Sequence, residues 1–252
     1  MASGNRLSIV VPAFNEEKRV GATIREIKAF ASQKGLDCEI IVVDDGSQDH
    51  TTQTVLKEFE PGNNSKLRLI KNDKNHGKGY SVRRGMLEAR GDFILFTDAD
   101  LSTPIEEVEK LIAAIREGSD VAIASRALPE SRVEIHQNIV RETMGKIFNR
   151  IARLFTFKHI RDSQCGFKCF RREVAHRLFS IAKVDGFSFD VEIIYLAQKF
   201  GLKVREVPVV WRNSPASKVH IIRDPPRMFW DLLRIRLIHL SHAQAQDAKA
   251  KE

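Results

Sequence analysis

Two aspartates on alternate residues, Asp98 and Asp100, directly follow the apolar run 93–96 and precede the segment 101–104. A buried strand that ends in carboxylates on alternate residues points both of them the same way, out of the carboxyl edge of a sheet. Hard oxygen ligands select Mg²⁺ or Mn²⁺, which usually bind one or two carboxylates together with substrate phosphates. The spacing indicates a site for a divalent cation and a diphosphate, although ordinary turns and helix caps contain the same tripeptide.

Other loops carry residues that suit the same ligand. Gly77-Lys78-Gly79 begins a predicted helix, where free backbone N–H groups and the helix dipole favour phosphate and the Lys78 ammonium adds a point charge. Asp44 and Asp45 end a predicted strand, and a carboxylate there can accept hydrogen bonds from a base edge or a ribose hydroxyl. A flexible loop and a strand-ending turn with a helix cap are the plain structural alternatives.

Alternating strands and helices must position these loops. Short β-branched runs at 7–11, 40–43, 67–70, 93–96 and 121–124 are typical of strands, and the patterns at 16–33, 51–59, 78–89 and 105–116 are typical of helices. This alternation predicts an α/β fold with a mostly parallel, doubly wound sheet. Ligands of such sheets bind beyond the carboxyl ends of the strands, so we expect four polar loops to meet in one crevice.

Composition limits the class of partner. The 252 residues are 42% hydrophobic, enough for a large core, and the net charge of +8 indicates an anionic partner. A basic nucleotide- or nucleic-acid-binding module without catalysis is the alternative from another class. The chain lacks the aromatic stacking motifs and the concentrated basic helix of such binders, so we expect no nucleic acid partner. Three cysteines without a zinc spacing predict free thiols in a reducing compartment.

Two amphipathic segments stand in the second half of the chain. The first covers 139–157, and the second opens at Pro225-Pro226 with an apolar stripe of Phe229, Leu232, Leu233, Leu237 and Leu240 beside arginines. Apolar faces with basic flanks suit an anionic membrane surface, and core-facing helices with a charged outer side are the alternative. No apolar run approaches the roughly 20 residues that span a bilayer. We therefore expect a cytoplasmic protein that lies on the cytoplasmic face of a membrane without a transmembrane segment.

The order of these motifs resembles that of the inverting family 2 glycosyltransferases, which have the A-type nucleotide-diphospho-sugar fold. The segments 162–168, 189–192 and 217–219, with Trp211, are similar to those of dolichyl-phosphate β-glucosyltransferases, so the resemblance covers about 7–240. It implies one catalytic domain over 1–252. We expect a nucleotide-sugar-binding half at 1–126, an acceptor-binding half at 127–222, and an amphipathic helix with a polar tail at 223–252.

The resemblance also implies a reaction. It predicts metal-dependent, inverting transfer of glucose from UDP-glucose to a dolichyl or other polyprenyl phosphate, with GDP-mannose as the alternative donor. The related mannosyltransferases typically continue D-A-D-L with Gln, and Ser102 stands there in this chain, which favours the glucosyl group. A lipid phosphate is already anionic at neutral pH, so the reaction requires no strong general base. For Asp190 and Glu192, catalytic and architectural roles both stay open.

Roles follow for individual residues. The resemblance implies that Asp98 and Asp100 hold Mg²⁺ or Mn²⁺. It gives the nucleotide-sugar site as Pro12, Ala13, Glu16, Asp44, Asp45, Lys78 and Asp98. An acceptor phosphate needs cations and carboxylates that fix them, and the candidates are Arg126, Arg141, Asp162, Lys168, Glu192 and Lys218. The predicted catalytic residues are Asp98, Asp100, Arg126 and Lys218.

Overall fold

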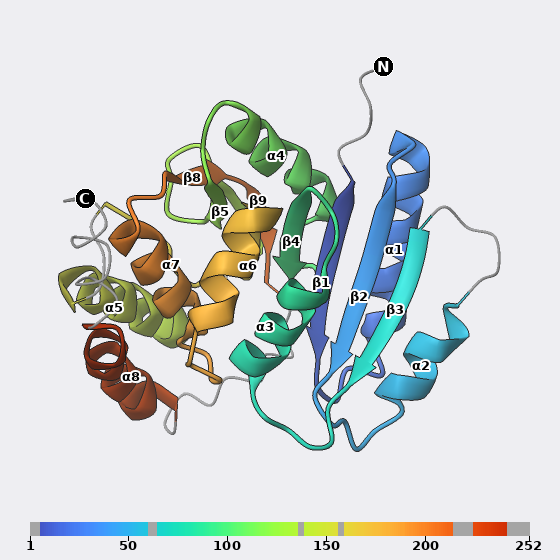
Figure 1. Ribbon diagram of the computed structural model, residues 1–252, viewed down its shortest axis with the longest axis horizontal. Coiled ribbons are helices and arrows are strands. Elements are labelled where there is room, and N and C mark those ends of the chain that lie inside the picture. Colours follow the sequence, from blue (N-terminus) through green and yellow to red (C-terminus); the bar gives the residue numbers. More distant parts are fainter. Residues whose placement is uncertain (1–5, 60–64, 136–138, 156–158, 214–223, 241–252) are drawn as a thin grey trace, which may run out of the picture.

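The computed structural model describes residues 6–59, 65–135, 139–155, 159–213 and 224–240. A seven-stranded sheet in the order β3-β2-β1-β4-β7-β5-β8 forms its centre (Figure 1). The strands are β1 (Leu7–Ala13), β2 (Cys38–Asp44), β3 (Ser65–Lys71), β4 (Phe93–Thr97), β5 (Val121–Ser125), β7 (Phe167–Arg171) and β8 (Val204–Pro208). The neighbours pair in parallel except that β7 runs antiparallel to β4 and β5. The predicted mostly parallel sheet is confirmed.

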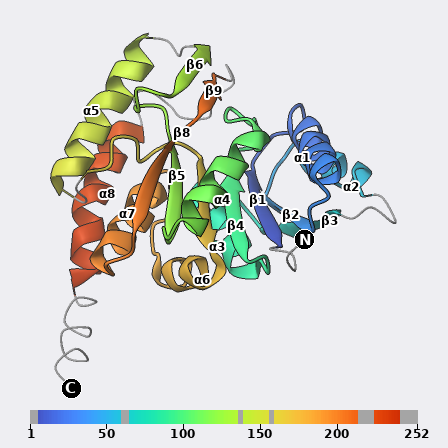
Figure 2. The ribbon, with the colours of Figure 1, turned by 90° about the horizontal axis from the view of Figure 1, so that it is seen from above.

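Helices cover both faces of this sheet. They are α1 (Val20–Lys34), α2 (Thr51–Lys57), α3 (Lys78–Glu88), α4 (Val108–Arg116), α5 (Ile139–Phe155), α6 (Arg172–Ile181), α7 (Phe189–Lys199) and α8 (Asp224–Ile238). Buried side chains of α1 and α4 form the core on one face, and those of α3, α6 and α7 form it on the other. Figure 2 shows α5 and α8 together at the end of the molecule remote from α1 and α2.

The structure differs from the sequence prediction in several elements, since strands β7 and β8 of the central sheet were not predicted. A parallel pair of β6 (Arg132–Ile135) and β9 (Val210–Arg212) forms a second small sheet that the hydrophobic pattern did not indicate. Helix α1 begins at Val20 and not at Glu16, and a hydrogen-bonded turn precedes it. The Glu16 N–H donates to the Thr51 hydroxyl at 2.7 Å, and the Arg19 N–H donates back to the Glu16 carbonyl at 2.9 Å.

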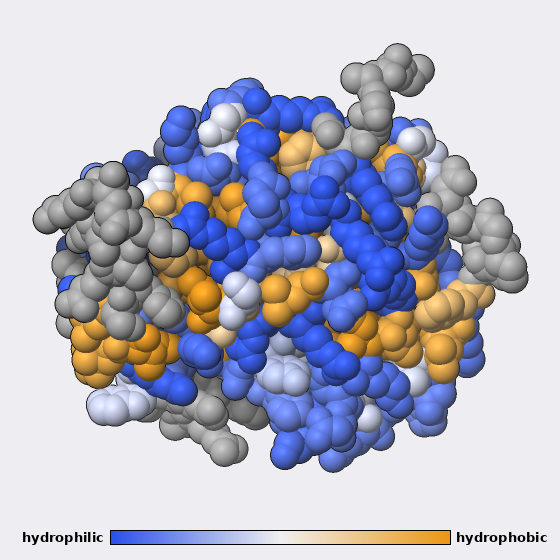
Figure 3. Space-filling view, viewed as in Figure 1, coloured by the Kyte–Doolittle hydropathy of each residue, from blue (hydrophilic) through white to orange (hydrophobic). Residues whose placement is uncertain are grey.

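The apolar residues of α8 divide between two faces. Leu232 is 1% exposed and Ile235 is fully buried, so the inner face belongs to the core. Trp230, Leu233, Leu237 and Leu240, at helical spacings of three, four and three, are 45–67% exposed. We call these four residues the outer stripe. The sequence analysis put Leu232 in one apolar stripe with Leu233, Leu237 and Leu240, and the structure divides that stripe because Leu232 packs inward. Figure 3 shows apolar atoms over the α5 and α8 corner at the lower left.

None of the described helices combines the length and the apolar content that a transmembrane span requires.

Candidate active site

The loop after β4 and the start of α3 meet through an ion pair. Lys78 Nζ lies 2.6 Å from Asp98 Oδ1. The Asp98 N–H donates to the Gly166 carbonyl at 3.2 Å, and a Cβ atom at Gly166 would overlap the Asp98 carboxylate. The chain therefore needs glycine at residue 166 for Asp98 to hold this position. Burial disfavours the charged form of Lys78, but the charges of Asp98 and Asp190 outweigh it and raise the Lys78 pKa.

Asp45 fixes the loop that leads to Lys78. Its carboxylate accepts the Gly77 N–H at 2.8 Å, the His76 N–H at 3.1 Å and the Asn72 side-chain amide at 2.6 Å. Gly77 has φ +109°, a conformation that favours glycine. The structure thus gives Asp45 a positioning role that the sequence did not assign.

Asp44 and the end of β1 lie beside this loop. Buried Asp44 accepts the Ser47 N–H at 2.9 Å and the Thr52 hydroxyl, so its carboxylate also shapes a loop. The Ala13 carbonyl accepts the Asp45 N–H at 2.8 Å, and Pro12 beside it is partly exposed. It stays a prediction that Pro12, Ala13, Asp44 and Asp45 contact a nucleoside.

Asp100 is oriented by a residue that the sequence analysis missed. Arg19 forms a bidentate pair with Glu16, with both N···O distances at 2.7 Å, and its Nη1 lies 3.6 Å from Asp100 Oδ2. The Ser102 N–H donates to Asp100 Oδ1 at 3.0 Å. The spacing of three residues between Glu16 and Arg19 was the sequence signal for this pair.

The donor set of Asp98 and Asp100 fits Mg²⁺ or Mn²⁺ shared with a ligand. Their side chains are 37% and 18% exposed. Within the described residues, no group of three histidine, cysteine, aspartate or glutamate side chains could hold a metal by itself. Magnesium commonly binds one or two carboxylates plus substrate phosphates. Phosphate oxygens of a substrate would therefore complete the coordination sphere.

On the far side of β4, Arg126 is held in a fixed orientation. Asp162 accepts from Arg126 Nε at 2.7 Å and Nη2 at 2.8 Å, and the Arg126 N–H donates to the same carboxylate at 3.0 Å. The guanidinium lies over the Trp211 ring at 5.3 Å from its centroid. Burial raises the pKa of Asp162, but the charge and hydrogen bonds of Arg126 outweigh it and lower the pKa from 3.8 to about 2.

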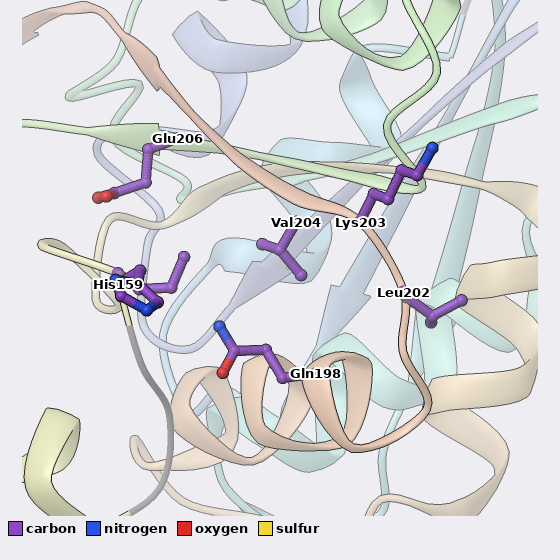
Figure 4. Close-up of a pocket in the computed structure, with 7 residues that line it drawn as sticks. His159, Gln198, Leu202, Lys203, Val204 and Glu206 are labelled. Atoms are coloured by element: carbon purple, nitrogen blue, oxygen red, sulfur yellow. The ribbon is translucent and has the colours of Figure 1, made fainter.

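A second carboxylate supports Asp162 from behind. Glu206 accepts the N–H groups of Arg161 and Asp162, each at 2.9 Å. Glu206 also lines a surface hollow of about 420 Å³ with His159 and Gln198 (Figure 4). The lining of this hollow includes none of the predicted site residues. Glu206 links the two regions, because it lines the hollow and also binds the backbone of Asp162.

The structure places Lys168 differently from the prediction. Its side chain is fully buried on β7, where Nζ donates to the Cys165 carbonyl at 2.7 Å and pairs with the Asp190 carboxylate. An ammonium enclosed in this way does not face an acceptor phosphate. Burial raises the pKa of Asp190 above its ordinary value, and the charges of Lys168 and Lys78 oppose that shift.

Glu192 is also enclosed by the protein and does not face an acceptor phosphate. It is fully buried, and its oxygens accept the N–H groups of Lys183 at 2.8 Å and Val184 at 2.9 Å. Of the remaining acceptor candidates, Arg141 lies in α5, where the structure describes its backbone alone. Lys218 lies outside the described residues.

The buried pair predicts an asymmetric response to mutation. Lys168→Met leaves the Asp190 carboxylate buried without its partner, and we expect the unfolding free energy to fall by about 3–5 kcal/mol. The double change Lys168→Met and Asp190→Leu removes both charges and should restore much of that loss. Urea unfolding of the parent and both variants measures this. Equal losses in the single and double variants would contradict a coupled pair.

The lowered pKa of Asp162 predicts how its contribution depends on pH. Its folded pKa of about 2 lies below the ordinary 3.8, so ionised Asp162 stabilises the fold above roughly pH 4 and loses this effect as pH falls through 2. The stability gap between the parent and Asp162→Asn should be full at neutral pH and close in this acid range. Urea midpoints across the range give the gap, and a constant gap would argue against the ionic role.

Comparison with known proteins identifies the family to which this site belongs. The family model for glycosyl transferase family 2 matches residues 8–179. The dolichyl-phosphate beta-glucosyltransferase of Saccharomyces cerevisiae is 36% identical, over 93% of this chain and 75% of the relative. The protein of that name from Homo sapiens is 37% identical, over 94% of this chain and 77% of the relative.

Solved structures share the fold at lower identity. Glucosyl-3-phosphoglycerate synthase from Mycobacterium tuberculosis, in complex with UDP, superposes with a TM-score of 0.68 at 20% identity, covering 92% of this chain and 80% of that one. Mannosyl-3-phosphoglycerate synthase from Rubrobacter xylanophilus also gives 0.68, at 22% identity, over 97% and 75% of the two chains. The fold, the order of the site loops and the relatives agree: this chain belongs to glycosyl transferase family 2.

Proposed function

We propose that this chain transfers glucose from UDP-glucose to a dolichyl or other polyprenyl phosphate, with inversion at the anomeric carbon. The observation that carries the proposal is a pair of fixed cations: Lys78 Nζ lies 2.6 Å from Asp98, and Asp162 holds the Arg126 guanidinium through two side-chain hydrogen bonds. Two fixed cations, each paired with a carboxylate, suit two phosphate-bearing substrates. The names of relatives at 36–38% identity support glucose as the sugar and dolichyl phosphate as the acceptor.

The described residues divide the work between donor and acceptor. An acceptor phosphate oxygen forms the new bond to the anomeric carbon while the bond from that carbon to the UDP oxygen breaks. Lys78 stabilises charge on the leaving diphosphate, and Arg126, fixed by Asp162, orients the acceptor phosphate. Asp98 and Asp100 would hold Mg²⁺ or Mn²⁺, which neutralises diphosphate charge when bound.

The reaction needs no protein base, and the site supports that view. Asp190 is engaged by Lys168, and Glu192 by two backbone N–H groups. Both carboxylates are buried and committed to structural partners. An architectural role is therefore the better interpretation of the two.

A membrane surface is the partner that best fits α8. The outer stripe exposes Trp230, Leu233, Leu237 and Leu240, and the exposed Arg234 and Arg236 stand beside it. A helix with an apolar face and basic flanks lies in the interface of an anionic bilayer. A polyprenyl acceptor resides in such a bilayer. We therefore place the protein peripherally on the cytoplasmic face of a membrane.

The reaction is tested with radiolabelled donor and a short polyprenyl phosphate. UDP-glucose should give labelled lipid with Mg²⁺ or Mn²⁺, and Asp100→Ala should lose activity because the diphosphate then lacks part of its cation site. Asp37→Ala, at a side chain 61% exposed away from the site loops, is the matched control and should keep activity. Full turnover in excess chelator, or transfer from GDP-mannose alone, would overturn the proposal.

The outer stripe is tested by sedimentation with anionic vesicles. Salt should release part of the bound protein, because basic flanks are screened within about 10 Å at 0.1 M. Leu237→Ser should weaken the salt-resistant part by roughly tenfold or more, as expected for an apolar side chain that leaves the bilayer. Leu56→Ser, at a comparably exposed leucine on α2, should bind like the parent. Equal binding by both variants would refute membrane contact through α8.

A further inference from the structure

Glu192 and His239 form a buried pair that the reaction itself does not use. Both side chains are fully buried, and His239 Nε2 lies 2.7 Å from Glu192 Oε1. The same carboxylate accepts the N–H groups of Lys183 and Val184, at 2.8 and 2.9 Å. A buried carboxylate is stable only with such partners, so these three contacts fix its position and the backbone that it binds.

The backbone held by Glu192 supports the loop that carries Lys78. The Tyr80 N–H, in the first turn of α3, donates to the Asp185 carbonyl at 3.2 Å. A Cβ atom at Gly77 would overlap the Asp185 carbonyl oxygen, and one at Gly79 would overlap the Val184 carbonyl oxygen. The two glycines on either side of Lys78 thus rest directly on residues 184 and 185. A shift of this backbone would move Lys78.

Helix α7 reaches Lys78 from a second side. Phe189, its first residue, has its ring centroid 5.8 Å from Lys78 Nζ, and Glu192 lies three residues later in the same turn. At the other end of α7, Lys199 Nζ donates to the His239 carbonyl. His239 therefore contacts α7 through both its ring and its backbone, and it follows the end of α8 directly.

We propose that Glu192 and His239 are positioning residues for the donor diphosphate. Glu192 fixes the backbone of Lys183 and Val184, His239 fixes Glu192, and the glycine loop that this backbone supports presents Lys78 to the leaving phosphates. The identity of that ligand rests on the proposed function, whereas the support of the loop rests on the contacts alone. Positioning residues touch no substrate, so their loss should weaken donor binding through a displaced loop.

The test measures loop stability and UDP binding separately in the full chain. In His239→Ala we expect faster amide hydrogen exchange at Val184 and Tyr80 without ligand, and roughly tenfold weaker UDP binding by calorimetry with Mn²⁺. His239→Gln, which keeps an N–H donor, should recover most of both effects. Ile235→Ala is the matched control, because it removes apolar packing from the inner face of α8 and leaves the hydrogen-bonding groups around Glu192 unchanged.

Each outcome decides one of the two claims. If Ile235→Ala lowers the melting temperature as much as His239→Ala and weakens UDP binding equally, the pair is merely structural and the inference fails. If exchange at Tyr80 is unchanged in His239→Ala, the inference fails while the proposed function stands. If the parent does not bind UDP but exchange responds to His239→Ala alone, positioning stands and the donor assignment fails. Glu192→Gln, which keeps the side-chain size, gives the same readouts if His239→Ala does not fold.

Discussion

The buried ion pair between Lys168 and Asp190 is the interaction on which the site depends. It joins β7, the strand beside the one that leads to Asp98, to the first turn of α7, which lies against Lys78. Burial of two charges costs free energy, and further contacts offset that cost. Lys168 also donates a hydrogen bond to the Cys165 carbonyl, and the positive charge of Lys78 also stabilises the Asp190 carboxylate. The pair thereby links β7 to α7 by a directional contact in addition to the apolar packing between the helices and the sheet.

Further ion pairs lie around the site residues. Lys78 pairs with Asp98, Arg126 with Asp162, and Arg19 with Glu16 beside Asp100. Each cation is therefore oriented by the protein before any phosphate arrives. Fixed charges in a partly enclosed site stabilise developing negative charge without the reorganisation that water would require.

Sequence patterns could predict the first half of the fold because its central strands are continuous apolar runs. They could not predict β7, since a buried Lys168 interrupts the apolar pattern and its partner Asp190 is distant in the chain. In the same way, buried Asp190 and Glu192 obscure the periodicity of α7. A polar residue type indicates a need for hydrogen bonds but does not say whether backbone or ligand supplies them.

That ambiguity explains which site residues the sequence placed well. The motifs brought Lys78 and Asp98 together correctly, because both stand at the carboxyl edge of the sheet. Asp45 and Glu192 proved to bind backbone N–H groups, which no spacing reveals. On α8 the apolar residues are spread over two faces, so the pattern could not tell Leu232, which packs inward, from Leu233, which is exposed.

The antiparallel strand β7 also determines when the sheet can form. Strands β1 to β4 find their parallel neighbours within the first 97 residues, whereas β5 takes both of its neighbours, β7 and β8, from later in the chain. During synthesis, strand β5 therefore cannot pair with its neighbours until the residues after 166 have been made. Until then β4 presents an open edge, the feature through which unfinished sheets associate with other chains. The sheet is consequently complete only when residues 167–171 and 204–208 have joined it, which is a non-local step of folding.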